Sequence, residues 1–407
     1  MGEQRYRWKG SELREQAAVI EGKQSPTKVL VNATYLHSYF REWVKGNIWI
    51  HGDRIVYAGE RLPDRVDEAC EIVDCRGYVL VPGYIEPHVH PFQLYNPRSF
   101  ARYAAARGTT TLVNDNLFFL LHLNDDEALL FLQQMNTLPT SMYWWCRFDG
   151  QTELEREDEQ LSNVRIKRWL DQETVLQGGE LTSWSRLVSG DDIVLYWMQE
   201  AKRRRRKIEG HFPGASEKTL VKMALFGVDG DHEAMTGKEV RTRLWHGYTV
   251  TLRHSSIRPD LPVLLDRNGR WHVNTMLKGF SSALGGLASS YSNTGDLVLI
   301  GKHKEDMLLA FRRMKEIGGG LVLAENGEIV FELPLPLGGM MSALEMESLI
   351  DKEKEFVRLL RERGYRFEDP VYSLLFLQST HLPYVRITQR GIYDVMHKTV
   401  LFPSIMR

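Results

Sequence analysis

The spacing of apolar and polar residues changes along the chain and divides it into parts of different character. The first part has short apolar runs that are rich in β-branched residues and are separated by Asn and Gly, which is typical of strands and turns. These runs are residues 27–36, 46–60 and 71–84. They predict a small β-module at 27–82, after a polar and helical lead-in at 1–26.

From residue 83 the pattern changes to strand-like runs that alternate with helix-like stretches such as 125–135 and 216–227. The strand-like runs are residues 109–116, 141–149, 175–180, 207–214, 226–233 and 248–256. With the run that ends near residue 90, they make seven strand candidates. Strands that alternate with helices at this spacing indicate parallel βαβ units. We therefore predict an α/β fold with a TIM-like (β/α)8-type barrel over residues 83–265.

The last part, residues 266–407, predicts a C-terminal α+β domain. Its helical segments, 303–319 and 342–365, each lead to a Gly that can end a helix. The Gly run at 318–320 has no Lys-Ser or Lys-Thr after it, so we interpret it as a turn and not as a phosphate loop. Residues 374–395 contain a Gln-Ser-Thr-His cluster between apolar runs. This cluster either lines a pocket or forms a corner between a strand and a loop, and the corner is the commoner case.

Side chains that can bind metal gather at the ends of the barrel strand candidates. In VPGYIEPHVHP, residues 81–91, His88 and His90 are two residues apart, so on a strand both imidazoles project from one face. One such pair is weak evidence, but the later strand candidates also end in polar residues. The series is His88, His90, Asn114, Asp115, Glu180, His211, Asp231, His232, Glu233, Arg253 and His254. Because catalytic groups of these barrels lie at the C-terminal strand ends, the series predicts a metal site.

The composition of the chain limits the classes of binding partner and the cellular compartment that we expect. The chain has 52 basic and 53 acidic residues, so no overall charge attracts nucleic acid or an anionic membrane. The basic run at 202–207 lies between an apolar stretch and a strand candidate, and we interpret it as the solvated end of a helix. Three cysteines form no CxxC pair, and the N-terminal stretch lacks the apolar core of a signal peptide. We therefore expect a cytoplasmic protein.

The ordered motifs of the barrel resemble the amidohydrolase superfamily and, within it, the adenine deaminases. The matching segments are PGYIEPHVHP (82–91), GTTTLVNDN (108–116), GGE (178–180), GHFPG (210–214) and DHE (231–233). Residues 274–280 and 312–327 are similar to the C-terminal domain of that family. Agreement in two domains makes the resemblance more specific than a His-x-His pair alone.

The resemblance implies a binuclear divalent metal centre. His88 and His90 would bind one ion. His211 and His232 would bind the other, and Glu180 would bridge the two ions. Imidazole and carboxylate together suit Mn²⁺ or Fe²⁺, with Zn²⁺ as the alternative. Such a centre would activate water for attack on C6 of adenine, giving hypoxanthine and ammonia, which is a step of purine metabolism.

The remaining site predictions concern the proton and the substrate. Glu233 is the candidate for proton transfer, although neighbours on a strand point to opposite faces, which would turn Glu233 away from a site that His232 faces. The candidate substrate-binding residues are Asn114, Asp115, Arg253 and His254.

The chain departs from the family pattern at the end of the barrel. The family has a further strand with an Asp that binds metal and handles the proton, but here residues 253–265 lead straight into the C-terminal domain. The segment 83–265 has 183 residues, against roughly 250 in a complete barrel. Either the block is truly deleted or the sequence joins two pieces around an absent segment. The unpaired edge of a seven-stranded barrel favours the second explanation.

Three functions stay open on these observations. The first is an adenine deaminase-like hydrolase with a small-molecule purine substrate. The second keeps the metal ions but acts on another heterocycle or a cyclic amide, since one fold serves many substrates. The third is an inactive paralogue that serves as a binding or assembly protein, which the missing Asp favours and the five other ligands oppose. We expect no nucleic-acid or membrane partner, and a homo-oligomer.

Overall fold

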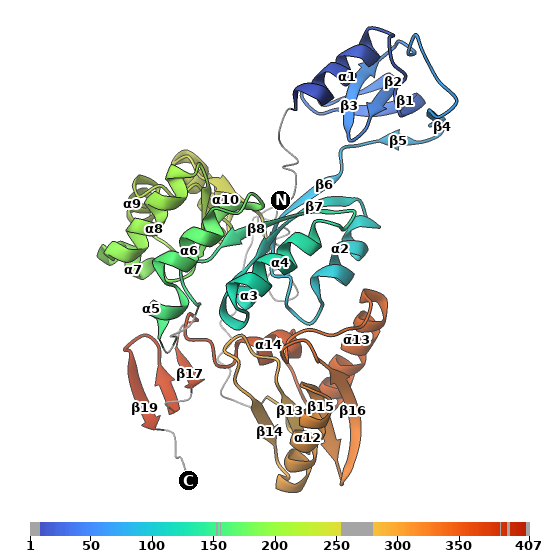
Figure 1. The fold of residues 1–407 in the computed structure, drawn as a ribbon. Coiled ribbons are helices and arrows are strands. Elements are labelled where there is room, and N and C mark those ends of the chain that lie inside the picture. The colour runs from blue at the N-terminus through green and yellow to red at the C-terminus, as the bar shows by residue number, and fades with distance from the viewer. Residues whose placement is uncertain are drawn as a thin grey trace. The chain divides into compact units, whose positions relative to one another are not determined.

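The computed structural model describes residues 9–151, 154, 156–253, 280–382, 384–388 and 391–403. The chain divides into two units, Met1–Tyr84 and Ile85–Arg407. In Figure 1 the first unit is blue, and the second runs from cyan through green and yellow to red.

The first unit is a small sheet with one helix. Its elements are α1 (Gly10–Ile20), β1 (Lys28–His37), β2 (Glu42–His51), β3 (Arg54–Gly59), β4 (Glu71–Asp74) and β5 (Val79–Leu80). The strands follow the order β3-β2-β1-β4, with β5 also paired to β1. Val19 of α1 is buried with Val29 and Trp49 of the sheet. The helical and strand segments predicted for this region are therefore present.

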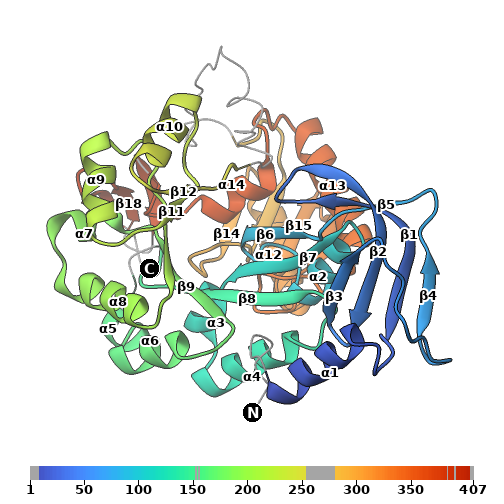
Figure 2. The same cartoon turned by 90° about the horizontal axis from the view of Figure 1, so that it is seen from above.

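The second unit begins with a parallel sheet whose strands lie side by side in chain order (Figure 2). The strands are β6 (Tyr84–Val89), β7 (Thr109–Asp115), β8 (Ser141–Cys146), β9 (Val175–Leu181), β10 (Lys207–Gly210), β11 (Gly230–Asp231) and β12 (Thr249–Val250). All seven predicted strand segments are found. Within the described residues β6 and β12 stand at the two ends of the sheet, and no eighth strand closes it. The α/β prediction of an incomplete TIM-like barrel is confirmed.

Helices connect these strands, as parallel pairing requires. They are α2 (Pro97–Ala105), α3 (Leu117–His122), α4 (Asp125–Met135), α5 (Glu157–Gln160), α6 (Asn163–Leu170), α7 (Trp184–Ser189), α8 (Asp192–Arg203), α9 (Glu217–Leu225) and α10 (Gly237–Trp245). Several begin at a side chain that accepts a backbone N–H, such as Asn124 before α4 and Asp191 before α8. The basic run at 202–207 spans the end of α8 and the start of β10, as the sequence predicted.

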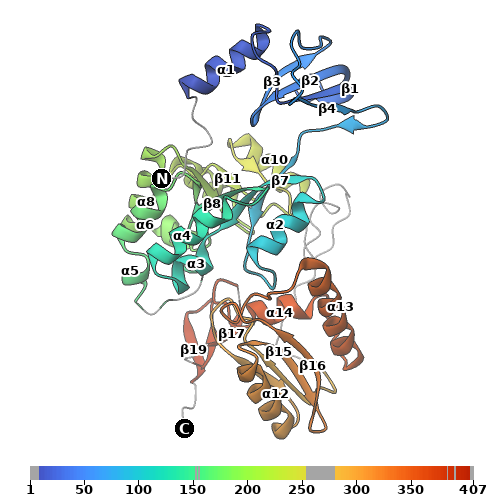
Figure 3. The ribbon, with the colours of Figure 1, turned by 45° about the vertical axis from the view of Figure 1, so that its right-hand side comes forward.

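The C-terminal part of the second unit is an antiparallel sheet with order β14-β13-β15-β16, against which α12 packs (Figure 3). Its elements are β13 (Gly286–Ser289), β14 (Val298–Gly301), α12 (Lys304–Glu316), β15 (Gly320–Glu325), β16 (Glu328–Pro334), α13 (Met346–Glu362) and α14 (Pro370–Phe376). A smaller sheet follows, with β17 (Val385–Thr388), β18 (Gly391–Asp394) and β19 (Thr399–Pro403). Both predicted helices are present, and Gly318 and Gly319 adopt the positive φ of a turn.

The barrel sheet and the C-terminal part share one buried apolar core. Polar contacts also join them: Asn96 Nδ2 donates to the backbone oxygen of Ser342 at 2.9 Å, and Ser342 N donates to the backbone oxygen of Leu94. None of the helices in the described residues combines the length and the apolar character that crossing a membrane demands.

Candidate metal centre

His88 and His90 lie at the end of β6 and direct their rings to one point. The Nε2 atoms of the two rings are 3.2 Å apart. Two nitrogens that each lie about 2.0–2.1 Å from one tetrahedral ion would be roughly 3.3 Å apart. The pair predicted from the i, i+2 spacing therefore has the separation of two ligands on a single metal ion.

His211 and His232 form a second pair with the same separation. His211 follows β10 and His232 follows β11, the next strand in the sheet. The Nδ1 atom of His211 lies 3.2 Å from Nε2 of His232. The two residues are distant in sequence, and the parallel sheet brings them together because neighbouring strands end at the same edge.

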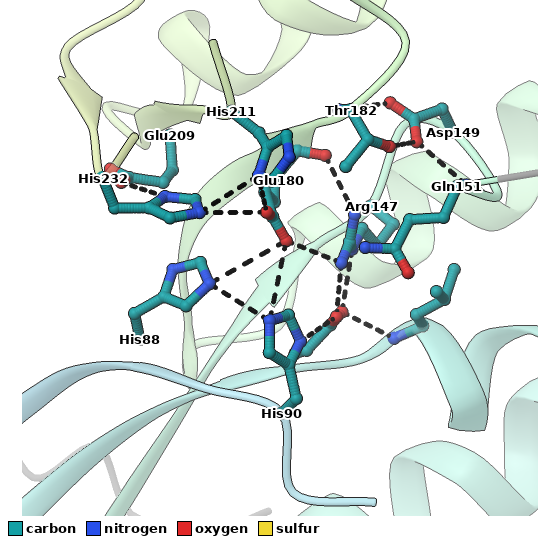
Figure 4. A network of polar contacts seen from close by, with 12 residues as sticks. His88, His90, Arg147, Asp149, Gln151, Glu180, Thr182, Glu209, His211 and His232 are labelled. Atoms are coloured by element: carbon teal, nitrogen blue, oxygen red, sulfur yellow. Dashed lines mark hydrogen bonds and ion pairs between the residues drawn. The ribbon is translucent and has the colours of Figure 1, made fainter. Parts of the chain in front are cut away.

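Glu180, at the end of β9, lies between the two pairs (Figure 4). Its Oε2 atom is 3.9 Å from Nε2 of both His88 and His90. Its Oε1 atom is 2.6 Å from Nδ1 of His211 and 3.1 Å from Nε2 of His232. Each carboxylate oxygen thus faces its own histidine pair, which is the arrangement of a bridging ligand.

We call His88, His90 and Oε2 of Glu180 the first half-site, and His211, His232 and Oε1 of Glu180 the second half-site. In each half-site the three donor atoms lie within 4.8 Å of one another. Imidazole nitrogen and carboxylate oxygen are donors for Mn²⁺, Fe²⁺ and Zn²⁺. The residues therefore fit a pair of divalent ions.

Arg147, which follows β8, is a buried cation beside the first half-site. Its Nη2 donates to Oε2 of Glu180 at 2.8 Å and to Oδ2 of Asp115 at 2.5 Å. Burial alone would raise the pKa of Glu180, but the charge of Arg147 and the contact with His211 outweigh burial and hold that pKa well below its usual range. Glu180 is therefore ionised and ready to bind a cation. The sequence analysis missed Arg147, because one arginine after a strand carries no motif.

Carboxylates orient one histidine of each half-site. Nδ1 of His90 lies 2.9 Å from Oδ2 of Asp115, and Nδ1 of His232 lies 3.2 Å from Oε1 of Glu209. A carboxylate on the far ring nitrogen fixes the ring and increases its basicity as a ligand. Glu209 was also missed. Its spacing of two residues from His211, which follows β10 directly, was the available signal.

The two half-sites differ in the pKa of their histidines. Burial, with the nearby charge of His232, lowers the pKa of His88 well below its ordinary value. Burial would also lower the pKa of His232, but its hydrogen bonds to Glu180 and Glu209 outweigh burial and raise the pKa to about 10. A positively charged ring is thus favoured at His232, and a neutral ring at His88.

Glu233 faces the second half-site. Its Oε1 is 3.4 Å from Nδ1 of His211 and 3.5 Å from Nε2 of His232. The strand argument that would turn Glu233 away fails because β11 ends at Asp231, so His232 and Glu233 are outside the strand and both side chains reach the site. Arg253 Nη1 donates to Oε1 of Glu233 at 2.6 Å. Asp231 itself pairs with Arg243.

The other residues predicted to bind substrate lie in different places. Arg253 lines the cavity above the metal donors, and its Nη2 also donates to the hydroxyl of Tyr372 at 3.0 Å. Asn114 is fully buried, and its Nδ2 donates to backbone oxygens of Leu112 and Tyr143. Asp115 is fully buried between His90 and Arg147. Neither Asn114 nor Asp115 is among the residues that line the cavity. His254 lies outside the described residues.

A cavity opens over both half-sites, and the C-terminal part contributes to its walls. Its lining includes the four metal-facing histidines and, from residues 367–398, Tyr372, His381 and Arg386. Thr380 and His381 of the Gln-Ser-Thr-His cluster therefore line a pocket, whereas Gln378 and Ser379 bond to Ser292 and Asn293.

A parallel sheet with His and Glu donors at its C-terminal strand ends defines the class of metal-dependent hydrolase barrels. Comparison with known families agrees. Residues 79–271 match the amidohydrolase family, and residues 257–399 match the adenine deaminase C-terminal domain.

Two bacterial relatives extend this similarity over the whole chain. The chain is 41% identical to "Putative adenine deaminase BH0637" of Halalkalibacterium halodurans and 40% identical to "Putative adenine deaminase YerA" of Bacillus subtilis. Both alignments cover 100% of each protein. The chain belongs to this adenine deaminase family, and the predicted resemblance is confirmed. Both comparisons support a hydrolytic aminohydrolase.

Solved structures are more distant. A mutant form of the atrazine chlorohydrolase TrzN of Arthrobacter aurescens aligns with a TM-score of 0.40 at 14% identity, over 57% of this chain and 73% of that one. Molinate hydrolase aligns with a TM-score of 0.36 at 14% identity, over 56% of this chain and 63% of that one.

The relatives are longer than this chain. Their alignments run over 581 positions, whereas the chain has 407 residues, so at least 174 aligned positions (581 − 407) have no residue here. The relatives therefore contain residues that have no counterpart in this chain. We expected a missing block after residue 265, a point that lies outside the described residues.

Proposed function

We propose that the protein is a metal-dependent aminohydrolase that converts adenine and water to hypoxanthine and ammonia. The observation that carries the proposal is the position of Glu180, whose two carboxylate oxygens each face a histidine pair. The choice of adenine is supported by relatives named as adenine deaminases and by the match to the C-terminal domain of that family.

The ligands of the two ions would be the predicted set. His88 and His90 would hold one ion in the first half-site, and His211 and His232 the other in the second. The mixed donors suit Mn²⁺ or Fe²⁺, with Zn²⁺ as the alternative. When bound, the ions supply the nucleophile by lowering the pKa of a water molecule.

Glu233 would carry the proton. A carboxylate that lies within about 3.5 Å of two metal-facing nitrogens is placed to take the proton of the attacking water and to hand a proton to the leaving amine. Arg253 holds this carboxylate from the cavity side at 2.6 Å. Arg253 would thus orient Glu233 and border the bound purine. The predicted role of His254 in substrate binding stays a prediction.

A second candidate is an inactive chain that binds a partner or assists assembly. Two observations favour it: the described sheet has open ends, and at least 174 aligned positions of the relatives are absent. The retention of all five predicted donors, Glu180 and the four histidines around it, favours the enzyme. The cytoplasmic location and the homo-oligomer also stay proposals. So does the lack of nucleic-acid and membrane partners, which the balanced charge of the chain supports.

The test is adenine consumption by the purified, Mn²⁺-loaded 407-residue chain. The His211→Ala variant removes one donor of the second half-site, and His397→Ala, an exposed histidine of the C-terminal part, is the matched control. We expect turnover in the wild type and in His397→Ala and its loss in His211→Ala. A chain that binds Mn²⁺ but leaves adenine and other amino-heterocycles unchanged would support the inactive candidate.

A further inference from the structure

His381 is the residue of the C-terminal part whose ring comes close to the metal donors. It lies after α14, in the loop before β17, and lines the same cavity as the two half-sites. The centre of its ring is 6.4 Å from that of His211. Its other aromatic neighbour is Phe376, at 5.6 Å in an edge-on arrangement. A residue far along the chain is thus brought beside the second half-site.

The Nδ1 atom of His381 is buried and has no hydrogen-bond partner among the described residues. A buried polar atom without a partner costs about 1–3 kcal/mol, so native proteins rarely keep one without a reason. A histidine that its own hydrogen bonds held in the core would have a partner for Nδ1, and this atom has none among the described residues. Solvent does not reach Nδ1, but His381 lines the cavity, so a ligand bound there would lie against its side chain.

The segment just before His381 is held in place by hydrogen bonds. Ser292 Oγ donates to Oε1 of Gln378 at 2.9 Å, and Arg386 Nε donates to the backbone oxygen of Ser379 at 3.1 Å. Ser379 also bonds to the side chain of Asn293. These contacts fix Gln378 and Ser379, the residues that lead into Thr380 and His381, so the ring is partly positioned before any ligand arrives.

Burial disfavours a charged imidazole at His381. Burial, with the charge of His211 as the next cause, lowers its pKa to about 3. A neutral imidazole has one donor and one acceptor nitrogen. It can therefore pair with either a ring nitrogen or an exocyclic amine of a heterocycle, whereas a charged ring could pair with an acceptor only.

We propose that His381 determines substrate specificity by forming a hydrogen bond from the C-terminal part to the bound amino-purine, close to the carbon that reacts. This inference rests on the proposed function and adds to it a residue that no metal-ligand motif contains. His381 does not bind metal or move a proton in this proposal, so its removal changes recognition of the heterocycle and leaves the metal centre intact.

The variants are His381→Phe, which keeps the ring and removes both nitrogens, and His381→Asn, whose amide can replace Nδ1. The control is His122→Phe, a solvent-exposed histidine that packs against Phe118 and does not line the cavity. Adenine kinetics, Mn²⁺ content and urea unfolding are measured for each Mn²⁺-loaded full chain.

For His381→Phe we expect kcat/KM for adenine to fall roughly tenfold, mostly through KM, because one neutral hydrogen bond is lost. His381→Asn should recover part of the loss. Metal content and resistance to urea should be unchanged, since Nδ1 has no partner within the described protein. His122→Phe should leave kcat/KM unchanged.

Three results would overturn the inference. One is a kcat/KM for His381→Phe that stays at the wild-type value. Another is a loss of Mn²⁺ or of folding in His381→Phe with no recovery of kcat/KM in His381→Asn, which would give the residue a structural role. The third is a wild-type protein that neither binds nor converts adenine. This result would refute the proposed function and, with it, this inference. It is distinguished from the other two results because it is seen in the wild type, without any variant.

Discussion

The two half-sites offer similar donors, but their surroundings differ in charge. In the first half-site Oε2 of Glu180 accepts a hydrogen bond from Arg147 at 2.8 Å and is 3.9 Å from either histidine. In the second half-site Oε1 is 2.6 and 3.1 Å from its histidines, and Arg147 makes no contact with it among the described residues. One carboxylate thus serves two unlike environments.

Acidic neighbours strengthen the difference. Glu209 and Glu233 both contact the second half-site, whereas the carboxylate next to the first, Asp115, is already paired with Arg147. Beside the second half-site these two acids face one arginine, Arg253, which pairs with Glu233. Beside the first, Asp115 and Arg147 balance each other. The surplus negative charge of the second half-site attracts a cation. We therefore expect the second half-site to bind the first metal ion and to bind it more tightly. The comparison teaches that a bridging ligand need not make two metal sites equivalent.

The largest effect is expected from Glu180→Gln, which removes the ligand that both half-sites share. The amide keeps the size of the side chain but loses its charge, so we expect the affinity for Mn²⁺ to fall roughly a thousandfold in both half-sites. The metal content after dialysis, measured by mass spectrometry, should drop from two ions to none. Two retained ions would show that Glu180 does not bridge.

Arg147→Met should destabilise the fold. Both carboxylates that Arg147 contacts, Asp115 and Glu180, are almost completely buried and would lose their cation. Removal of one partner from a buried ion pair costs about 3–5 kcal/mol. Urea unfolding of the chelated protein measures the change. Mn²⁺ should recover part of the loss, since it supplies the missing positive charge, and an unchanged stability would refute this account of Arg147.

A matched pair of variants separates the half-sites. Glu209→Gln should weaken the tighter Mn²⁺ binding step, and Asp115→Asn the weaker one, each by about 10–100-fold, because a carboxylate behind a ligand histidine tunes its affinity. Calorimetric titration resolves the two steps. The same step affected in both variants would contradict the assignment of the acids to separate half-sites.

The smallest effect concerns pH. The pKa of His232 is raised to about 10 from an ordinary value of 6.5. Its contribution to stability is therefore fully present below pH 6.5 and is lost as the pH rises to about 10. The unfolding free energy of chelator-treated protein should fall over this window more steeply than that of His232→Gln. Equal slopes in the two proteins would show that His232 carries no such proton in the folded, metal-free protein.

Much of the site could be predicted from the sequence, because its donors stand at regular places. His88 and His90 share a strand face, and Glu180, His211 and His232 each lie at or just after the end of a strand in a sheet whose order is the chain order. When parallel strands alternate with helices, the C-terminal ends of the strands meet at one edge of the sheet. The position of a donor then follows from the position of the strand end.

The remaining features of the site depend on the directions of side chains and on contacts between residues that are far apart in the sequence. Arg147 reaches Glu180 on the neighbouring strand, and His381 comes from another part of the unit, so no local pattern marks either residue. Glu233 faces the site because β11 is only two residues long, a detail that the apolar run around it does not reveal. Asn114 stands at a strand end like the ligands, but its amide bonds to the backbone of the neighbouring strand.

The most direct test of the shared carboxylate is electron paramagnetic resonance of the full chain with two equivalents of Mn²⁺. Ions bridged by Glu180 at the roughly 3.5–4 Å spacing of two-metal sites should be magnetically coupled. We predict the spectrum of a coupled Mn²⁺ pair, preceded at one equivalent by the signal of a single ion in the second half-site. A spectrum of two isolated ions at two equivalents would contradict the account.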